Sequence, residues 1–190
     1  MLADALVAAE RVASESEDPS GYGEDDPAKR RAEIVQAHAV SLGHQEVDVT
    51  AFEIMEYPVT NAMWPAYMKK TGAAAPASWP PGAAMPADDA ATGVSQAEAA
   101  AFAVHHGWSL PSEAEWQLAE AVIAPQLDGT SEYTTNLFAP YRGGDQAAFA
   151  EPRGQICARG SAAKLPPCIA ARRGLAREHR FKFARFRCVR

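Results

Sequence analysis

Leu110-Pro111-Ser112-Glu113-Ala114-Glu115-Trp116 is the stretch of this 190-residue chain that decides the fold. Pro111 fixes the approach of the chain, and Ser112 with Glu115 has the spacing of a capping box, in which the two side chains satisfy free amides at a helix start. Leu110 and Trp116 flank this start, and we expect both to be buried. Carboxylates in a first helical turn usually serve the cap and the helix dipole, so we interpret Glu113 as scaffold rather than as a catalytic acid.

Further elements follow from similar local patterns. A second capping box, Ser95 with Glu98, predicts another short helix that ends at Gly107. Alternating apolar residues over 46–57 predict a strand, and residues 60–72 predict a short helix that tolerates Pro65 in its first turn and closes at Gly72. The proline-rich stretch 73–93 is expected to be a loop pinned by Trp79, residues 126–156 to be loop-like, and the basic and apolar alternation of 181–189 to form a strand.

The domain organisation follows from length and composition. Hydrophobic residues make up 47% of the chain, which allows a sizeable core, and 190 residues fit one domain with a terminal extension. We assign residues 1–45 to an N-terminal helical extension with an acidic linker, and residues 46–190 to the folded domain. The chain holds no apolar run of membrane-spanning length, and its start is a poor signal peptide. We therefore expect a cytoplasmic protein whose cysteines, Cys157, Cys168 and Cys188, are reduced thiols.

Charge is distributed unevenly along the chain. Residues 1–32 carry a net charge of −4 and residues 33–152 carry −12, whereas residues 153–190 carry eleven bases against the single acid Glu178. A basic end can indicate nucleic-acid binding. The preferred interpretation is that this end folds back onto the acidic body, because a chain with a net charge of −6 matches a basic protein partner better than it matches nucleic acid.

Several of these pieces stand in a familiar order. The stretch 46–64, with its Val59-Thr60-Asn61 turn, precedes Gly93-Val94-Ser95 and the 110–116 motif, and the elements Arg159-Gly160-Ser161, Ala170-Ala171-Arg172 and Phe186-Arg187-Cys188 follow. In this order the chain resembles the formylglycine-generating-enzyme (sulfatase-modifying-factor) family. The resemblance implies an α+β domain of the C-type-lectin-like kind with much irregular structure.

The resemblance also implies a test for enzyme activity. Active members of the family oxidise a substrate cysteine and bind Cu(I) through two cysteines shortly after the Gly-Gly-Ser element. Lys164 stands where the first cysteine is expected, and Cys168 lies near the second, so Cys168 is the one candidate catalytic residue of the alternative, a formylglycine-generating copper oxidase. The family's central Gly-Asn-Val-Trp-Glu-Trp segment, which helps to build calcium sites, has no counterpart. We therefore expect no catalysis and neither copper nor calcium as a cofactor.

Other branches of the family use iron with three histidines, which makes the histidines of this chain candidate metal ligands. His38, His44 and His179 stand alone in the sequence, and His105-His106 are adjacent residues that point in different directions on a helix. A helix C-terminus favours histidine without any metal. We expect no metal site.

The functional hypothesis is a non-catalytic domain that forms a heterodimer with a protein partner. Short cytoplasmic members of the family resemble bacterial immunity proteins that neutralise secreted toxins, including basic nucleases and type VI secretion effectors, as in a toxin–antitoxin pair. Acids would steer such a basic partner and aromatics would anchor it. An alternative is a lectin-like ligand-binding module. The predicted partner-binding residues are Trp79, Asp88, Asp89, Asp128, Glu132, Tyr133, Tyr141 and Asp145.

Overall fold

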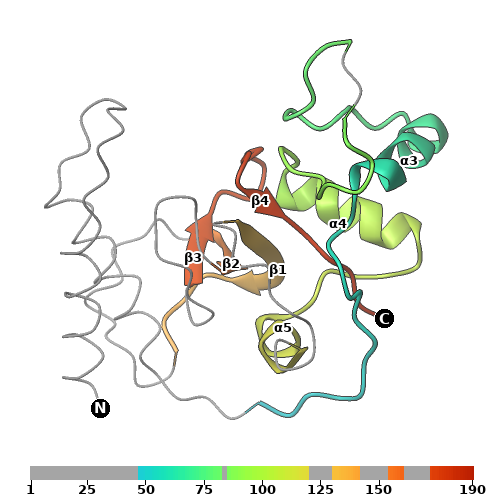
Figure 1. Ribbon diagram of the computed structural model, residues 1–190. Helices are drawn as coiled ribbons and strands as arrows, with labels where there is room; N and C mark the ends of the chain where they lie inside the picture. Colours follow the sequence, from blue (N-terminus) through green and yellow to red (C-terminus); the bar gives the residue numbers. More distant parts are fainter. Residues whose placement is uncertain (1–46, 83–84, 120–129, 142–153, 161–171) are drawn as a thin grey trace, which may run out of the picture.

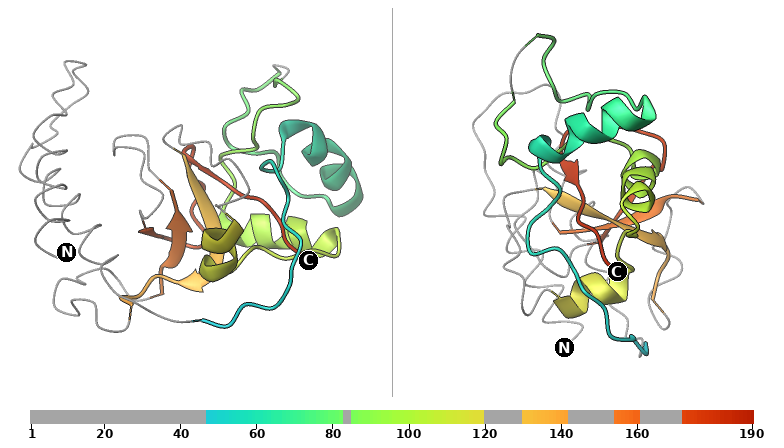
Figure 2. Two further views of the ribbon diagram at one scale, coloured as in Figure 1. Left: turned by 60° about the horizontal axis from the view of Figure 1, so that its bottom comes forward. Right: turned by 90° about the vertical axis from the view of Figure 1, so that its right-hand side faces the viewer.

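The computed structural model describes residues 47–82, 85–119, 130–141, 154–160 and 172–190, which form a small mixed domain of helices around a sheet (Figure 1). Four strands make one sheet in the order β3-β2-β1-β4. Helices α4 and α5 lie against this sheet, and α3 packs beyond α4 (Figures 1 and 2). The predicted α+β class is confirmed at this level. The predicted extension 1–45 and its acidic linker lie outside the described residues.

The helices begin where local sequence signals place them. The 3-10 helix η1 (Asn61–Met63) leads into α3 (Trp64–Thr71), which has Pro65 in its first turn and ends at Gly72 in the left-handed conformation. Helix α4 (Gln96–His105) carries the complete capping box of Ser95 and Glu98. Helix α5 (Glu113–Ala119) begins with the second box, since the Glu115 carboxylate accepts the Ser112 amide at 2.6 Å and the Ser112 hydroxyl accepts the Glu115 amide at 3.1 Å. The helices predicted within 60–72, after Ser95 and after Ser112 are confirmed.

The strands lie where the sequence signal is weakest. Strands β1 (Ser131–Leu137) and β2 (Ile156–Arg159) pair antiparallel, β2 pairs antiparallel with β3 (Arg172–Leu175), and β1 pairs parallel with β4 (Ala184–Arg185). The prediction that 126–156 is loop-like was wrong for 131–137. Polar residues fill the buried positions of β1, so it lacks the apolar alternation that marks a strand.

The strands predicted over 46–57 and 181–189, at the two ends of the folded domain, are mostly irregular segments without long strand pairing. Residues 47–59 form one isolated bridge, Ile54 with Val189, and backbone hydrogen bonds such as Glu53 N to Arg190 O at 2.8 Å. Of the strand predicted over 181–189, only β4 (Ala184–Arg185) is regular. In residues 47–57 partly buried apolar side chains alternate with exposed ones, whereas residues 184–189 are buried throughout and their basic members, Arg185 and Arg187, pair with Glu132.

The core lies between the sheet and the helices and is rich in aromatic rings. Trp64 stacks on Phe102 with centroids 5.1 Å apart, and Tyr67 and Phe186 meet this pair edge to face. Leu110 and Trp116 are buried, as predicted. Trp79 is half-buried, packs against the core and donates its indole N–H to Asn61 Oδ1 at 2.8 Å, so it pins the 73–93 loop as expected.

Candidate functional site

A row of charged residues crosses the sheet beneath α5. The strand register places Arg172 beside Arg159, Arg159 beside Glu132, and Glu132 beside Arg185. Neighbouring residues in register project from the same face of a sheet, about 5 Å apart. Two arginines side by side repel each other unless a counter-ion lies between them. Helix α5 supplies that counter-ion.

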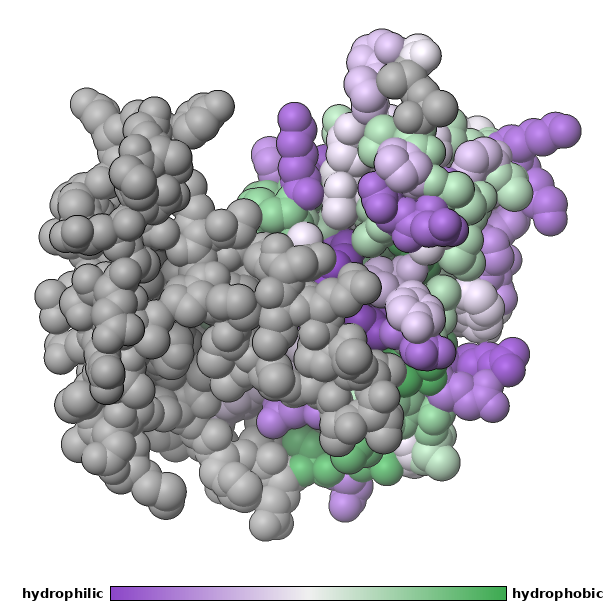
Figure 3. All heavy atoms as spheres, viewed as in Figure 1, coloured by the Kyte–Doolittle hydropathy of each residue, from purple (hydrophilic) through white to green (hydrophobic). Residues whose placement is uncertain are grey.

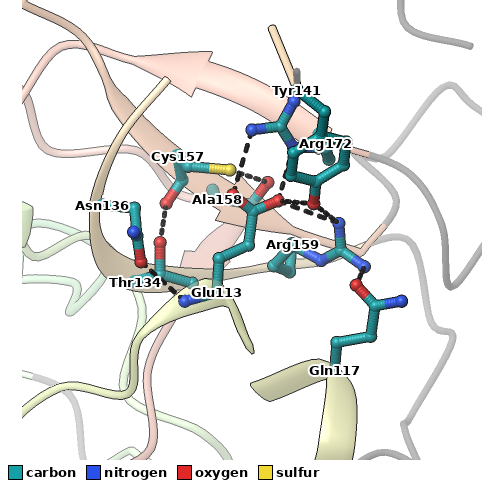
Figure 4. A network of polar contacts seen from close by, with 9 residues as sticks. All are labelled: Glu113, Gln117, Thr134, Asn136, Tyr141, Cys157, Ala158, Arg159 and Arg172. Carbon is teal, nitrogen blue, oxygen red and sulfur yellow. Dashed lines mark hydrogen bonds and ion pairs between the residues drawn. The ribbon is translucent and has the colours of Figure 1, made fainter. Parts of the chain in front are cut away.

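Glu113 is the counter-ion of the first arginine pair (Figure 4). Its Oε1 accepts from Arg159 Nη1 at 3.0 Å and from Arg172 Nε, and its Oε2 accepts from Arg172 Nη2 at 3.0 Å. The Tyr141 hydroxyl donates to the same carboxylate, and the Arg172 guanidinium lies over the Tyr141 ring, 3.8 Å from its centroid. We name this group, Glu113 with Arg159, Arg172 and Tyr141, the Glu113 cluster.

Glu132 plays the same role for a second arginine pair. Its Oε2 accepts from Arg187 Nε at 2.6 Å, and its Oε1 accepts from Arg187 Nη2 at 2.8 Å and from Arg185 Nε at 3.3 Å. All three side chains are at most 3% exposed. Arg187 also donates to the Met55 and Glu56 carbonyl groups, which ties the C-terminal segment to residues 53–59. We name this group the Glu132 cluster.

Trp116 joins the two clusters. Its indole N–H donates to Glu132 Oε2 at 2.8 Å, and the Arg159 guanidinium lies 5.4 Å from its ring centroid. The 110–116 motif therefore does more than start a helix. Its side chains reach both ion clusters, so α5 contacts β1, β2 and β3 directly, and Glu132 of β1 links β4 through Arg185.

The carboxylates in both clusters stay ionised. Burial alone would raise the pKa of Glu113, but the hydrogen bonds from Arg172 and Tyr141 and the charges of both arginines lower it below its usual value. Burial likewise opposes ionisation of Glu132, and Arg187 with Arg185 and Trp116 lowers its pKa overall. An ionised glutamate clamped between guanidinium groups is a poor proton donor or acceptor, so both clusters fit a structural role.

The two cysteines of the described segments are buried thiols of low reactivity. Cys157 lies on β2 next to the Glu113 cluster, and Cys188 lies in the core near the C-terminus. Burial is the largest cause that raises the pKa of each thiol to about 12. Both are therefore neutral thiols at pH 7, whereas metal binding and nucleophilic attack need the thiolate. Cys168 lies outside the described residues.

The predicted partner-binding surface needs correction. Glu132 is 2% exposed and ion-paired, and Tyr133 is fully buried with its hydroxyl on the Val94 carbonyl at 2.9 Å. Tyr141 is half-buried and bonded to Glu113. Glu132 and Tyr133 face the interior because residues 131–137 form a central strand, and Tyr141, which follows this strand, is engaged by Glu113. Asp88 and Asp89 are exposed on the 73–93 loop beside the half-buried Trp79, and Asp128 and Asp145 lie outside the described residues.

Two adjacent histidines lie at the C-terminal end of α4. His105 ends α4 and His106 caps it, with the His106 Nδ1 2.9 Å from the Phe102 carbonyl oxygen and the two rings at 80° to each other. Within the segments that the structure describes, no three His, Cys, Asp or Glu residues are grouped as metal ligands. Among the same segments, no helix has the length and apolar character needed to span a bilayer.

Sequence reasoning missed the two ion clusters, although it had noticed their residues. Arg159, Arg172 and Arg187 each belong to one of the closing elements of the sequence, and the local pattern around Glu113 indicates only a helix start. The available signal was the ratio of charges. A C-terminal region with eleven bases and a single acid must find carboxylates elsewhere in the chain, and among the described residues it pairs with Glu113 and Glu132 in the interior and with Glu53 and Glu98 nearer the surface.

A comparison with known protein families identifies the family of this domain. The pattern of the sulfatase-modifying factor enzyme 1-like domain, the FGE-sulfatase family, matches residues 19–152. No curated protein matches the sequence. The matched residues include the whole 110–116 motif and cover more than half of the chain, and the chain belongs to the FGE-sulfatase domain family.

Proposed function

We propose that this chain is a non-catalytic, protein-binding member of its family, with a C-type-lectin-like fold. The observation that carries the proposal is the sequence after Arg159-Gly160-Ser161, where Lys164 replaces one cysteine of the expected copper pair and Cys168 alone remains. Cys157 and Cys188 cannot readily substitute, because both are buried as neutral thiols. Two-coordinate Cu(I) needs two thiolates, so the oxidase chemistry lacks its metal site.

The partner that we propose is a basic secreted bacterial toxin, which the chain would neutralise in the cytoplasm as an immunity protein. Support comes from the net charge of −6 and from the exposed Asp88-Asp89 pair. The loop that carries this pair is held in place, since the Asp89 carbonyl accepts the Asn61 amide at 2.9 Å and the Asn61 side chain binds Trp79. Acids on a fixed loop can steer and position a basic partner with little loss of conformational entropy.

The binding test titrates this chain with a basic secreted toxin, to be sought among the products of genes next to its own. We expect calorimetry to show association that weakens from 50 to 300 mM NaCl, and that weakens at least about tenfold when Asp88 and Asp89 are both changed to lysine. The matched control reverses Asp48 and Glu56, two exposed acids outside this loop. No association, or equal losses for the two double variants, would contradict the proposed partner surface.

The oxidase alternative has its own measurement. In a Cu(I) titration against a chromophoric chelator, we expect weak copper binding that Cys168→Ser leaves unchanged. Tight copper binding that disappears in Cys168→Ser would instead support the hypothesis that the chain is a copper oxidase.

A further inference from the structure

The 73–93 loop carries the two acids of the proposed partner surface and no other charge. In the sequence of this loop, Asp88 and Asp89 are the only charged residues. Neither carboxylate forms an ion pair with any described residue. Where Figure 1 draws the loop, at the top of the view, Figure 3 shows mostly pale and apolar residues. Any recognition of charge by this loop therefore depends on where these two carboxylates are held.

A buried side chain from outside the loop connects its two halves. Asn61 begins η1 and is only 4% exposed. Its Oδ1 accepts the indole N–H of Trp79 at 2.8 Å, and its Nδ2 donates to the Pro86 carbonyl at 3.1 Å. Trp79 belongs to the first half of the loop and Pro86 to the second half, which carries the acids. One amide side chain, acting as acceptor and donor at once, therefore bridges the loop.

The backbone at the start of η1 continues this bridge. No side chain caps η1, so its first amides need other acceptors. The Asn61 amide donates to the Asp89 carbonyl at 2.9 Å, and the Ala62 amide donates to the Ala87 carbonyl at 3.0 Å. Together with the side-chain bond described above, three carbonyl groups of the turn 86–89 face η1. The backbone that carries the two acids is thus tied to the buried start of a helix.

We propose that Asn61 is the positioning residue of the partner-binding loop, and that it holds the turn 86–89 so that Asp88 and Asp89 meet a basic partner as a preformed pair. The inference rests on the proposed function and adds the residue that orders this surface before the partner arrives. A surface that is ordered in the free protein loses little conformational entropy on binding. Without the bridge, both carboxylates remain exposed, but the turn must become ordered during association. Affinity then falls although no charge is removed.

Hydrogen exchange of the free full-length chain tests whether Asn61 holds the turn. Three amides report on it, because those of Asn61 and Ala62 donate to the turn and that of Ala91 donates to the Val59 carbonyl at 2.8 Å. We expect Asn61→Ala to speed the exchange of these amides at least about fivefold, whereas the amides of α4 keep the rate of the parent chain. Exchange at these three positions that stays as slow as in the parent chain would overturn the inference.

Two further variants separate the bridge from a general loss of stability. Trp79→Phe keeps an aromatic ring and removes the indole N–H, so it should speed the same amides to a smaller extent. Thr134→Ala is the matched control, because it also removes a buried side-chain hydrogen bond, from the Thr134 hydroxyl to the Cys157 carbonyl at 2.7 Å, but on β1. The three amides should exchange at the parent rate in Thr134→Ala. Equal acceleration in Asn61→Ala and Thr134→Ala would assign the effect to overall stability and overturn the inference.

The binding readout uses the basic toxin that passes the calorimetric test above. Asn61→Ala should raise Kd at least about fivefold and keep the salt dependence of the parent chain, because both carboxylates remain. Reversal of Asp88 and Asp89 should change the salt dependence itself. An unchanged Kd in Asn61→Ala, with faster exchange, would show that order in the loop does not serve binding. A parent chain that binds no basic toxin would overturn the proposed function and with it the binding role of Asn61, and the exchange rates would separate this outcome from a turn that Asn61 does not hold.

Discussion

Glu113 and Glu115 lie two residues apart in the first turn of α5, and the structure gives them different roles. Glu115 completes a capping box at the surface of the helix start, as its spacing predicts. Glu113 points into the sheet and neutralises Arg159 and Arg172. Local sequence fixes the first role, because the partner is three residues away. The second role needs partners 46 and 59 residues away, which no local pattern reveals.

This difference leads to a prediction at the residue scale. Glu113→Gln should lower the free energy of unfolding by about 3–5 kcal/mol, because it leaves two buried guanidinium groups without their counter-charge. Glu115→Gln should cost less than about 1 kcal/mol, because an amide oxygen still accepts the Ser112 N–H. Urea unfolding of both variants at pH 7 measures the difference. Equal losses would mean that the Glu113 cluster contributes no more than an ordinary helix cap.

The sequence predicts the helices, whose ends depend on neighbouring residues. It does not predict strand β1, whose stability depends on residues far away in the sequence. Capping residues, prolines and closing glycines lie within or next to helices α3, α4 and α5. Where each helix starts and ends therefore depends on a short stretch of sequence. Strand β1 is different, because Ser131, Glu132 and Thr134 are buried polar residues. The Thr134 hydroxyl donates to the Cys157 carbonyl at 2.7 Å and Glu132 meets two arginines, so the partners that make these positions tolerable lie on other strands.

The 73–93 loop supplies a prediction at the element scale, through two glycines with similar positive φ angles. Gly72 has φ +75° and open space where a Cβ would stand, whereas Gly93 has φ +73° and would place that Cβ 2.4 Å from the Ser78 amide nitrogen. Gly72→Ala should therefore cost about 1–2 kcal/mol from backbone strain alone. Gly93→Ala should cost about 1–3 kcal/mol more, since two backbone segments must move apart.

Thermal unfolding monitored by circular dichroism would compare these two variants. Proteolysis of the 73–93 loop would show where the damage lies, and faster cleavage is expected in Gly93→Ala only. Equal melting temperatures for the two variants would contradict the close approach of Gly93 and Ser78.

At the scale of the whole molecule, the prediction that the basic end folds back onto an acidic body is confirmed. Arginines from 159 to 190 pair with Glu53, Glu98, Glu113 and Glu132, which lie far earlier in the sequence. The same pairing removed Glu132 from the predicted partner surface. Electrostatics thus holds the two halves of the domain together and leaves few charges of the basic end for binding.

The pairing predicts how stability depends on pH. The pKa values of Glu113 and Glu132 are lowered in the folded chain from their usual value of 4.5. A lowered folded pKa means that the unfolded chain binds protons first as the pH falls, so stability is constant above about pH 5.5 and declines below 4.5. Urea midpoints measured from pH 7 to 3 should show this decline. Glu113→Gln should show a smaller decline than the parent chain, and a parent midpoint unchanged down to pH 3 would contradict the two clusters.

The sequence by itself determined the helix starts, the family-defining motif and the charge imbalance, because each depends on residues close together in the chain or on simple counts. Only the tertiary structure decided which carboxylates neutralise which arginines, that residues 131–137 form a central strand, and that Glu132, Tyr133 and Tyr141 face inward. These outcomes depend on contacts between segments tens of residues apart. A buried charge is acceptable only when its partner is in place, and the fold alone brings the partners together.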